Sequence, residues 1–155
     1  MSAHALDHDA LVDFLARPWN ARIATVDAEG WPHVTPVWYD YDVAARTFLV
    51  VGRERAAWVA HVSREPRVAI HVAEDVAGRN TRVLVRGRAT ILEGPVAPSA
   101  SARIGDLTDR LSLRYLGPNG PTYAARTADR PRVLIAIRAE RWQSWTGGEW
   151  HPKYR

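Results

Sequence analysis

Hydrophobic side chains recur every three to four residues in three stretches of the chain, which is the spacing of one helix face. Pro18, Pro66 and Gly117 stand just beyond these stretches, where a helix cannot continue or is commonly capped. The predicted helices cover Asp7 to Ala16, about Glu54 to Ser63, and a longer segment containing Ile104, Leu107, Leu111 and Tyr115.

Elsewhere apolar and polar residues alternate or form short apolar runs, as in β-strands. The turn at Glu29-Gly30 predicts a hairpin. Pro32 and Pro36 place the second strand of this hairpin at a sheet edge or a bulge. In a later, longer strand, Gly87 marks a bend. The predicted strands are 21–27, 31–42, 46–51, 67–72, 81–92 and 133–137, with 141–145 pairing back onto the last; 74–80 and 118–132 are predicted loops.

Six to seven strands, mostly linked by hairpins, outnumber the helices and do not alternate with them. This order disfavours a doubly wound parallel sheet and favours a mainly β, α+β fold, an antiparallel barrel with helices packed outside. At 155 residues the chain is expected to form one domain over residues 1–155.

The composition is that of a globular protein, 46% hydrophobic and 25% charged. There is no cysteine, and the single methionine is the initiator. Since no apolar run approaches the roughly 20 residues that cross a bilayer, and no leader pattern opens the chain, we expect a cytoplasmic protein without membrane contact.

The net charge of +4 and pI near 9.9 favour anionic partners. Of the 21 basic residues, 20 are arginines, and they are scattered among acidic residues rather than gathered in a stripe. This distribution favours a small anionic ligand over nucleic acid.

Motifs for metal binding or nucleophilic catalysis are missing from the sequence. His4 and His8 are four residues apart, but no cysteine and no HExxH accompanies them, and GxSxG, GxGxxG and P-loop patterns do not occur. We therefore predict no metal site and no dedicated catalytic residue, so an enzyme of this sequence takes its reactive group from a cofactor.

The segment that follows Gly52 is a candidate anion site. The glycine lets the backbone turn, the first amides of the following helix lack partners, and Arg53 and Arg55 can contact phosphate oxygens. Alternatively, Glu54 and Glu65 pair with these arginines on a solvated surface. Local pattern does not separate the two interpretations.

Seven tryptophans are many for 155 residues. Trp58, one predicted turn after Arg55, shares a helix face with it. Core packing or a dimer interface explains most such side chains, whereas rings around a cleft suit a flat, conjugated ligand. The others are Trp19, Trp31 and Trp38, and a C-terminal group of Trp142, Trp145 and Trp150.

Between Ala10 and Gly94 the sequence resembles the pyridoxamine 5′-phosphate oxidase-like split-barrel superfamily of flavin and deazaflavin enzymes. Three motifs carry the resemblance: a hairpin strand G-x-P-x-x-x-P-V-W, a helix ending R-x-P-R-V, and a strand V-R-G-R-A. The resemblance implies an FMN-binding split β-barrel and a homodimer that holds FMN or the deazaflavin coenzyme F420 at the subunit interface.

The resemblance also implies the cofactor-binding residues. The ring lies against the second strand and the phosphate-bearing tail at the end of the third strand and the helix. The implied residues are Pro36, Val37 and Trp38 for the ring and Gly52, Arg53, Arg55, Ala57 and Trp58 for the tail.

One position departs from the family pattern. Relatives commonly carry a basic residue, usually lysine, where this chain has Trp58, and often another at the places of Ala56 and Ala57. Arg53 and Arg55 then replace the lost phosphate contacts, or the ligand differs. The second case corresponds to a non-catalytic flavin or haem/tetrapyrrole-binding protein.

We favour F420, because its acidic oligoglutamate tail suits a basic protein and an arginine-rich composition suits the high-GC bacteria that use it; FMN is the alternative. The expected function is hydride transfer between this cofactor and an unsaturated or conjugated small molecule.

Overall fold

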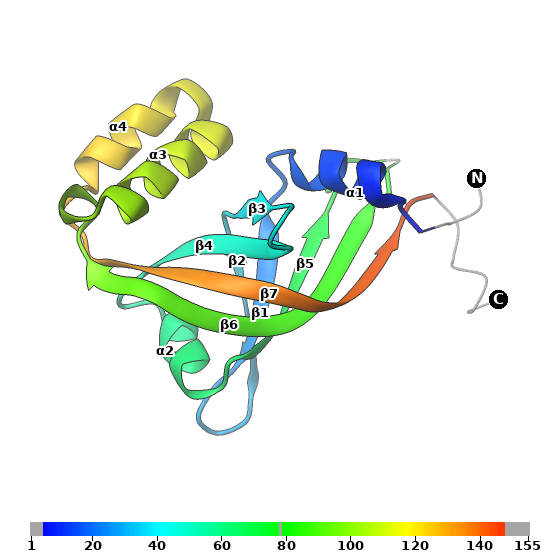
Figure 1. The fold of residues 1–155 in the computed structure, drawn as a ribbon, viewed down its shortest axis with the longest axis horizontal. Coiled ribbons are helices and arrows are strands. Elements are labelled where there is room, and N and C mark those ends of the chain that lie inside the picture. The colour runs from blue at the N-terminus through cyan, green and yellow to red at the C-terminus, as the bar shows by residue number, and fades with distance from the viewer. Residues whose placement is uncertain (1–4, 78, 148–155) are drawn as a thin grey trace.

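The computed structural model of the protein describes residues 5–77 and 79–147, in which seven strands and four α-helices form (Figure 1). His4, His151, Trp150 and the rest of the C-terminal tail lie outside the described residues. The strands are β1 Ala21–Val26, β2 Pro32–Val37, β3 Asp40–Asp42, β4 Thr47–Arg53, β5 Arg67–Ala73, β6 Arg82–Val96 and β7 Arg132–Trp145. The helices are α1 His8–Leu15, α2 Ala57–Arg64, α3 Ala102–Leu116 and α4 Gly120–Arg126.

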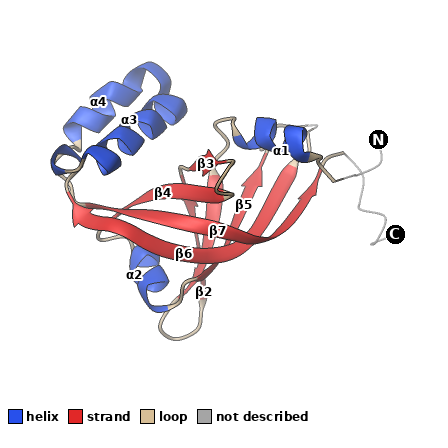
Figure 2. Ribbon diagram, viewed as in Figure 1, coloured by secondary structure: helices blue, strands red, loops and turns tan. Residues whose placement is uncertain are grey.

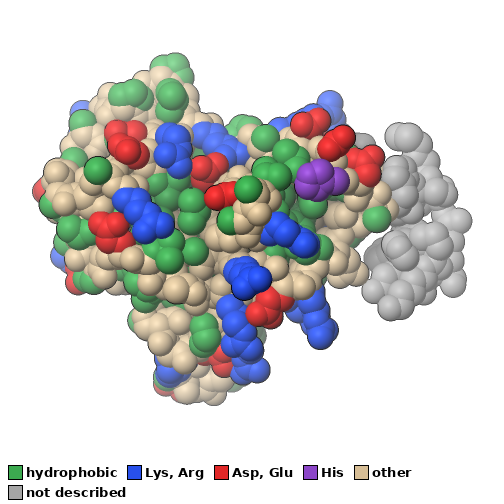
Figure 3. All heavy atoms as spheres, in the orientation of Figure 1, with side chains coloured by type: hydrophobic (Ala, Val, Ile, Leu, Met, Phe, Trp, Pro, Cys, Tyr) green, Lys and Arg blue, Asp and Glu red, His purple; other side chains and the backbone are tan. Residues whose placement is uncertain are grey.

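All seven strands belong to one antiparallel sheet with the order β2-β1-β5-β6-β7-β4-β3 (Figure 2). The helices flank the sheet, with α3 and α4 together at one end of the long strands β6 and β7 (Figure 1). The predicted fold class, a mainly β split barrel with flanking helices, is confirmed. On the face drawn in Figure 3, basic and acidic side chains are interspersed.

The sheet curls because its two edge strands are consecutive in the chain. Only Trp38 and Tyr39 separate the end of β2 from the start of β3. Three virtual bonds of 3.8 Å hold the two edges within about 11 Å of each other at this point. In the described part of the chain β2 and β3 do not pair, so the barrel stays split. The prediction of one strand over 31–42 was therefore wrong, whereas the edge position predicted from Pro32 and Pro36 is confirmed.

The long strands β6 and β7 pair along most of their length and form the curved front of the barrel (Figure 1). Their register shifts between Arg86 and Gly87, where a Cβ would collide with the carbonyl oxygen of Arg138, so the predicted bend at Gly87 is confirmed. Residues 141–145 continue β7 and pair with β6; the prediction that they pair back onto 133–137 was wrong.

Two hydrophobic clusters pack α1, α2 and α3 against the sheet. The larger fills the barrel, with Tyr39 and Phe48 fully buried, and includes Trp58 from α2. The smaller lies under α3, where Ile104, Leu107 and Leu111 pack on Leu134 of β7. This packing places one side of α3 beside the end of β4 and the start of β7.

Helix α4 lies in the segment 118–132 that was predicted as a loop. Pro121 stands in its first turn, where the missing amide hydrogen costs nothing. Gly120 lets the two helices approach closely, since a Cβ there would lie 2.6 Å from the backbone of Ser112. None of the described helices is long and apolar enough to span a membrane.

Candidate functional site

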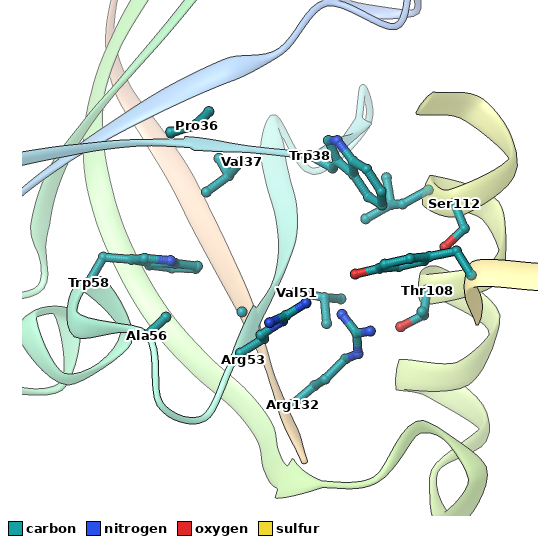
Figure 4. A pocket seen from close by; sticks show the side chains of 13 residues that line it. Pro36, Val37, Trp38, Val51, Arg53, Ala56, Trp58, Thr108, Ser112 and Arg132 are labelled. Carbon is teal, nitrogen blue, oxygen red and sulfur yellow. The ribbon is translucent and has the colours of Figure 1, made fainter. Parts of the chain in front are cut away.

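A pocket of about 250 Å³ opens where β2 and β4 end, between α2 on one side and α3 and α4 on the other (Figure 4). Six of the eight predicted cofactor-binding residues line it: Pro36, Val37, Trp38, Gly52, Arg53 and Trp58. Arg55 and Ala57 lie outside its described lining. The residues that sequence reasoning did not assign to a site are Val51, Ala56, Thr108, Leu111, Ser112, Tyr123 and Arg132.

The start of α2 differs from its prediction in a way that changes the site. The helix begins at Ala57, with Ala56 as its N-cap, about three residues later than expected. Arg55 therefore precedes the helix, and its side chain is exposed whereas Trp58 is buried, so the prediction that the two share a helix face was wrong.

Gly52 is required for a close approach rather than for a turn. It is a strand residue paired with Val133, and a Cβ on it would lie 2.7 Å from the ring of Trp58 and 2.5 Å from Cγ2 of Val59. Trp58 is 6% exposed and belongs to the barrel core. The edge of a core tryptophan thus forms one wall of the pocket.

Two guanidinium groups converge at the centre of the pocket, from Arg53 at the end of β4 and Arg132 at the start of β7 (Figure 4). Neither forms an ion pair within residues 5–77 and 79–147, and no carboxylate belongs to the described lining. Glu65 binds Arg67 at 2.6 Å, so the alternative in which it pairs with Arg53 or Arg55 was wrong. The pocket therefore carries positive charge that the described protein does not neutralise.

Arg132 is 6% exposed, and the protein holds it from two sides. Its Nη2 donates a hydrogen bond of 2.7 Å to Oγ1 of Thr127, and its guanidinium lies 5.8 Å from the ring centroid of Tyr123. These contacts fix the side chain without compensating its charge.

Aromatic rings form the wall opposite Trp58. Trp38 stacks on Tyr115 at a centroid distance of 5.3 Å and meets Tyr123 edge to face at 5.6 Å. Burial raises the pKa of Tyr123, but the guanidinium groups of Arg132 and Arg53 outweigh this effect, through hydrogen bonding and charge, and hold the pKa below its ordinary value. The lowered pKa of Tyr123 is thus a consequence of the positive charge in the pocket.

Helix α3 contributes buried hydroxyl groups. Thr108 is 4% exposed and Ser112 is fully buried, and their oxygens have no hydrogen-bond partner in the described protein; the same holds for Nε of Arg132. Unsatisfied buried polar atoms are uncommon in native proteins and are a reason to look for a ligand. The pocket thus combines aromatic walls, positive charge and free polar groups.

Comparison with known proteins identifies one family and several solved structures of similar fold. The family model for pyridoxamine 5′-phosphate oxidase matches residues 7–146, a range that contains the whole described lining of the pocket. Among solved structures, an F420 reductase is 27% identical with a TM-score of 0.63, covering 84% of this chain and 94% of its own.

Two further structures are similar in fold. A conserved hypothetical protein from Mycobacterium tuberculosis is 23% identical, with a TM-score of 0.66 over 90% of this chain and 84% of its own. A haem storage protein from Vibrio cholerae is 17% identical, with a TM-score of 0.66 over 89% of this chain and 94% of its own. A comparison with the curated proteins gives no significant match.

Proposed function

The chain belongs to the pyridoxamine 5′-phosphate oxidase family, and from this premise we propose that it is an oxidoreductase that uses coenzyme F420, with FMN as the alternative cofactor. The substrate is an unsaturated or conjugated small molecule that exchanges a hydride with the cofactor. One observation carries the proposal: six of the eight residues implied for cofactor binding line one pocket with unpaired positive charge. The similarity to an F420 reductase supports the choice of cofactor.

The lining fits such a ligand chemically. Val37, Trp38 and the edge of Trp58 offer apolar surface for a planar ring, and Arg53 offers a charged donor for a phosphate oxygen. When bound, the cofactor supplies the hydride chemistry. The chain's own residues orient the ring, hold the anionic tail and exclude water from the reacting face.

A second copy of the chain is part of the proposal. The pocket of about 250 Å³ is below the roughly 300–1,000 Å³ of typical ligand sites, so one chain covers only part of the cofactor. Trp31 and Val34, at 71% and 62% exposed, leave apolar surface around the edge strand β2 that leads into the pocket. We propose that a homodimer buries this surface and completes the site.

The purified protein's absorption spectrum and titration with F420, FMN and haem separate the candidate functions. Saturable binding of F420 or FMN, followed by reduction of a conjugated acceptor, supports the oxidoreductase. Binding without turnover, or a Soret band on haem addition, supports the alternative of a non-catalytic flavin or haem/tetrapyrrole-binding protein. Binding of none of the three contradicts both.

Arg53→Gln is expected to weaken F420 or FMN binding by about tenfold or more, because a hydrogen bond to a charged group contributes about 1.5–3 kcal/mol. Cofactor fluorescence titration measures the change. Arg103→Gln removes an exposed arginine of α3 outside the pocket and is the matched control. Equal affinities of the two variants would remove Arg53 from the site.

A further inference from the structure

We propose that the inner wall of this pocket is an oxyanion subsite, in which Arg132, Thr108 and Ser112 bind a phosphoryl or carboxylate group. The subsite itself follows from the protein's own groups. Only the identity of the rest of the ligand rests on the proposed function. Figure 4 shows the three side chains on the side of the pocket formed by α3 and the start of β7, opposite Trp58.

The charge of Arg132 is the first argument. Removing a guanidinium from water is costly unless an opposite charge accompanies it. Arg132 is 6% exposed, and the groups around its guanidinium in the described protein are the hydroxyl of Thr127 and the phenol side chain of Tyr123, neither of which is a carboxylate. With Nη2 held by Thr127, Nε still lacks a partner in the described chain. A bound anion supplies both the missing charge and the missing acceptor.

The two hydroxyls are an independent argument. Thr108 and Ser112 are four residues apart in α3, so their side chains stand one above the other on the same helix face. Hydroxyls in a helix interior commonly bond to the carbonyl one turn earlier, but no such bond is formed at either residue in the described structure. Both line the pocket with Arg132, and both have a hydrogen to donate.

An anion held by this inner wall is also consistent with the absence of a basic residue at position 58 of α2. The resemblance places a basic residue at the position of Trp58, whose ring instead packs in the core beside Gly52. Positive charge reaches the same pocket from β7, on the far side, and Arg53 stands between the two walls. The anion is thus held by the strand and α3 rather than by α2.

Inorganic phosphate is the first probe, titrated into the wild-type protein by calorimetry in a buffer without other oxyanions. Saturable binding is expected, and Arg132→Met, which keeps an apolar stem of similar length, is expected to weaken it at least tenfold. Arg103→Gln is expected to bind phosphate like the wild type. Absence of saturable phosphate binding, or equal binding by Arg132→Met, overturns the subsite.

The paired change Thr108→Val and Ser112→Ala keeps the proposal testable if Arg132→Met does not fold. Since these hydroxyls have no partner in the described protein, their removal is expected to leave the melting temperature unchanged or higher. Phosphate binding is expected to weaken at least threefold. Unchanged phosphate affinity in a folded double variant contradicts the role of α3.

Paired ligands identify the source of the anion. If Arg132→Met loses affinity for FMN but not for riboflavin, which lacks the phosphate, the subsite takes the cofactor's phosphate. If both affinities are unchanged while phosphate binding is lost, it takes an anionic group of the substrate. Failure of F420 and FMN to bind at all, with phosphate binding intact, contradicts the proposed function and leaves the subsite standing.

Discussion

Trp58→Lys is expected to destabilise the protein by about 3–5 kcal/mol, although the resemblance makes lysine the ordinary residue at this position. The indole is 6% exposed and packs in the barrel core, and its ring fills the space that a side chain at position 52 would take. The substitution leaves a void and places an ammonium among apolar groups. Urea denaturation measures the loss of unfolding free energy.

Leu113→Lys is the control for this prediction. Leu113 is a helical apolar residue that is 58% exposed and lies outside both the pocket and the proposed dimer surface, so introducing lysine there is expected to change stability by no more than about 0.5 kcal/mol. If Trp58→Lys is as stable as the wild type and binds the cofactor more tightly, Trp58 is not required in the core. Helix α2 then still forms the site that binds the cofactor's phosphate.

Arg114→Ala is the second change with a large expected effect, a loss of about 2–4 kcal/mol. The side chain is 19% exposed, and its Nη2 donates hydrogen bonds of 2.8 Å to the carbonyl of Leu15 and 3.2 Å to that of Arg17. Its Nη1 donates to the carbonyl of Tyr39 at 3.3 Å. One residue of α3 thus ties the end of α1 to the junction of β2 and β3, next to the pocket.

Arg110→Ala separates this anchoring from simple charge loss. Arg110 lies one turn earlier in α3 and pairs with Asp40 at 3.0 Å, but its side chain is 58% exposed. Exposed pairs contribute about 0–1 kcal/mol, so its loss is expected to be small. Similar losses for the two variants, measured by urea denaturation, would contradict the anchoring role of Arg114.

Local pattern predicted most of the strands because alternation survives in β1, β4 and β5 and a short apolar run marks the buried start of β7. It did not show that the chain leaves the sheet at Trp38 and Tyr39, since apolar residues continue through the break. The two halves of the predicted strand pair at opposite edges of the sheet, a relation between distant segments. Helix α4 was missed because glycine and proline were interpreted as loop signals, although both suit a helix start.

The candidate site could be predicted only in part. Residues at the ends of β2 and β4 were found through a resemblance, whereas Arg132 opens a buried strand and has no local signature of binding. A usable signal lay in α3, where Thr108 and Ser112 are polar residues among the buried positions Ile104, Leu107 and Leu111. Two hydroxyls one turn apart on an apolar face are a reason to look for a ligand. That these hydroxyls line the same pocket as Arg132 depends on tertiary packing and could not be read from the sequence.

The most direct test of the cofactor site is a crystal structure of the protein saturated with F420 or FMN. We expect the ring against Val37 and Trp38, and an anionic group of the cofactor or of a bound oxyanion within hydrogen-bond distance of Arg53 or Arg132. A cofactor bound away from the pocket at the ends of β2 and β4 would contradict this expectation.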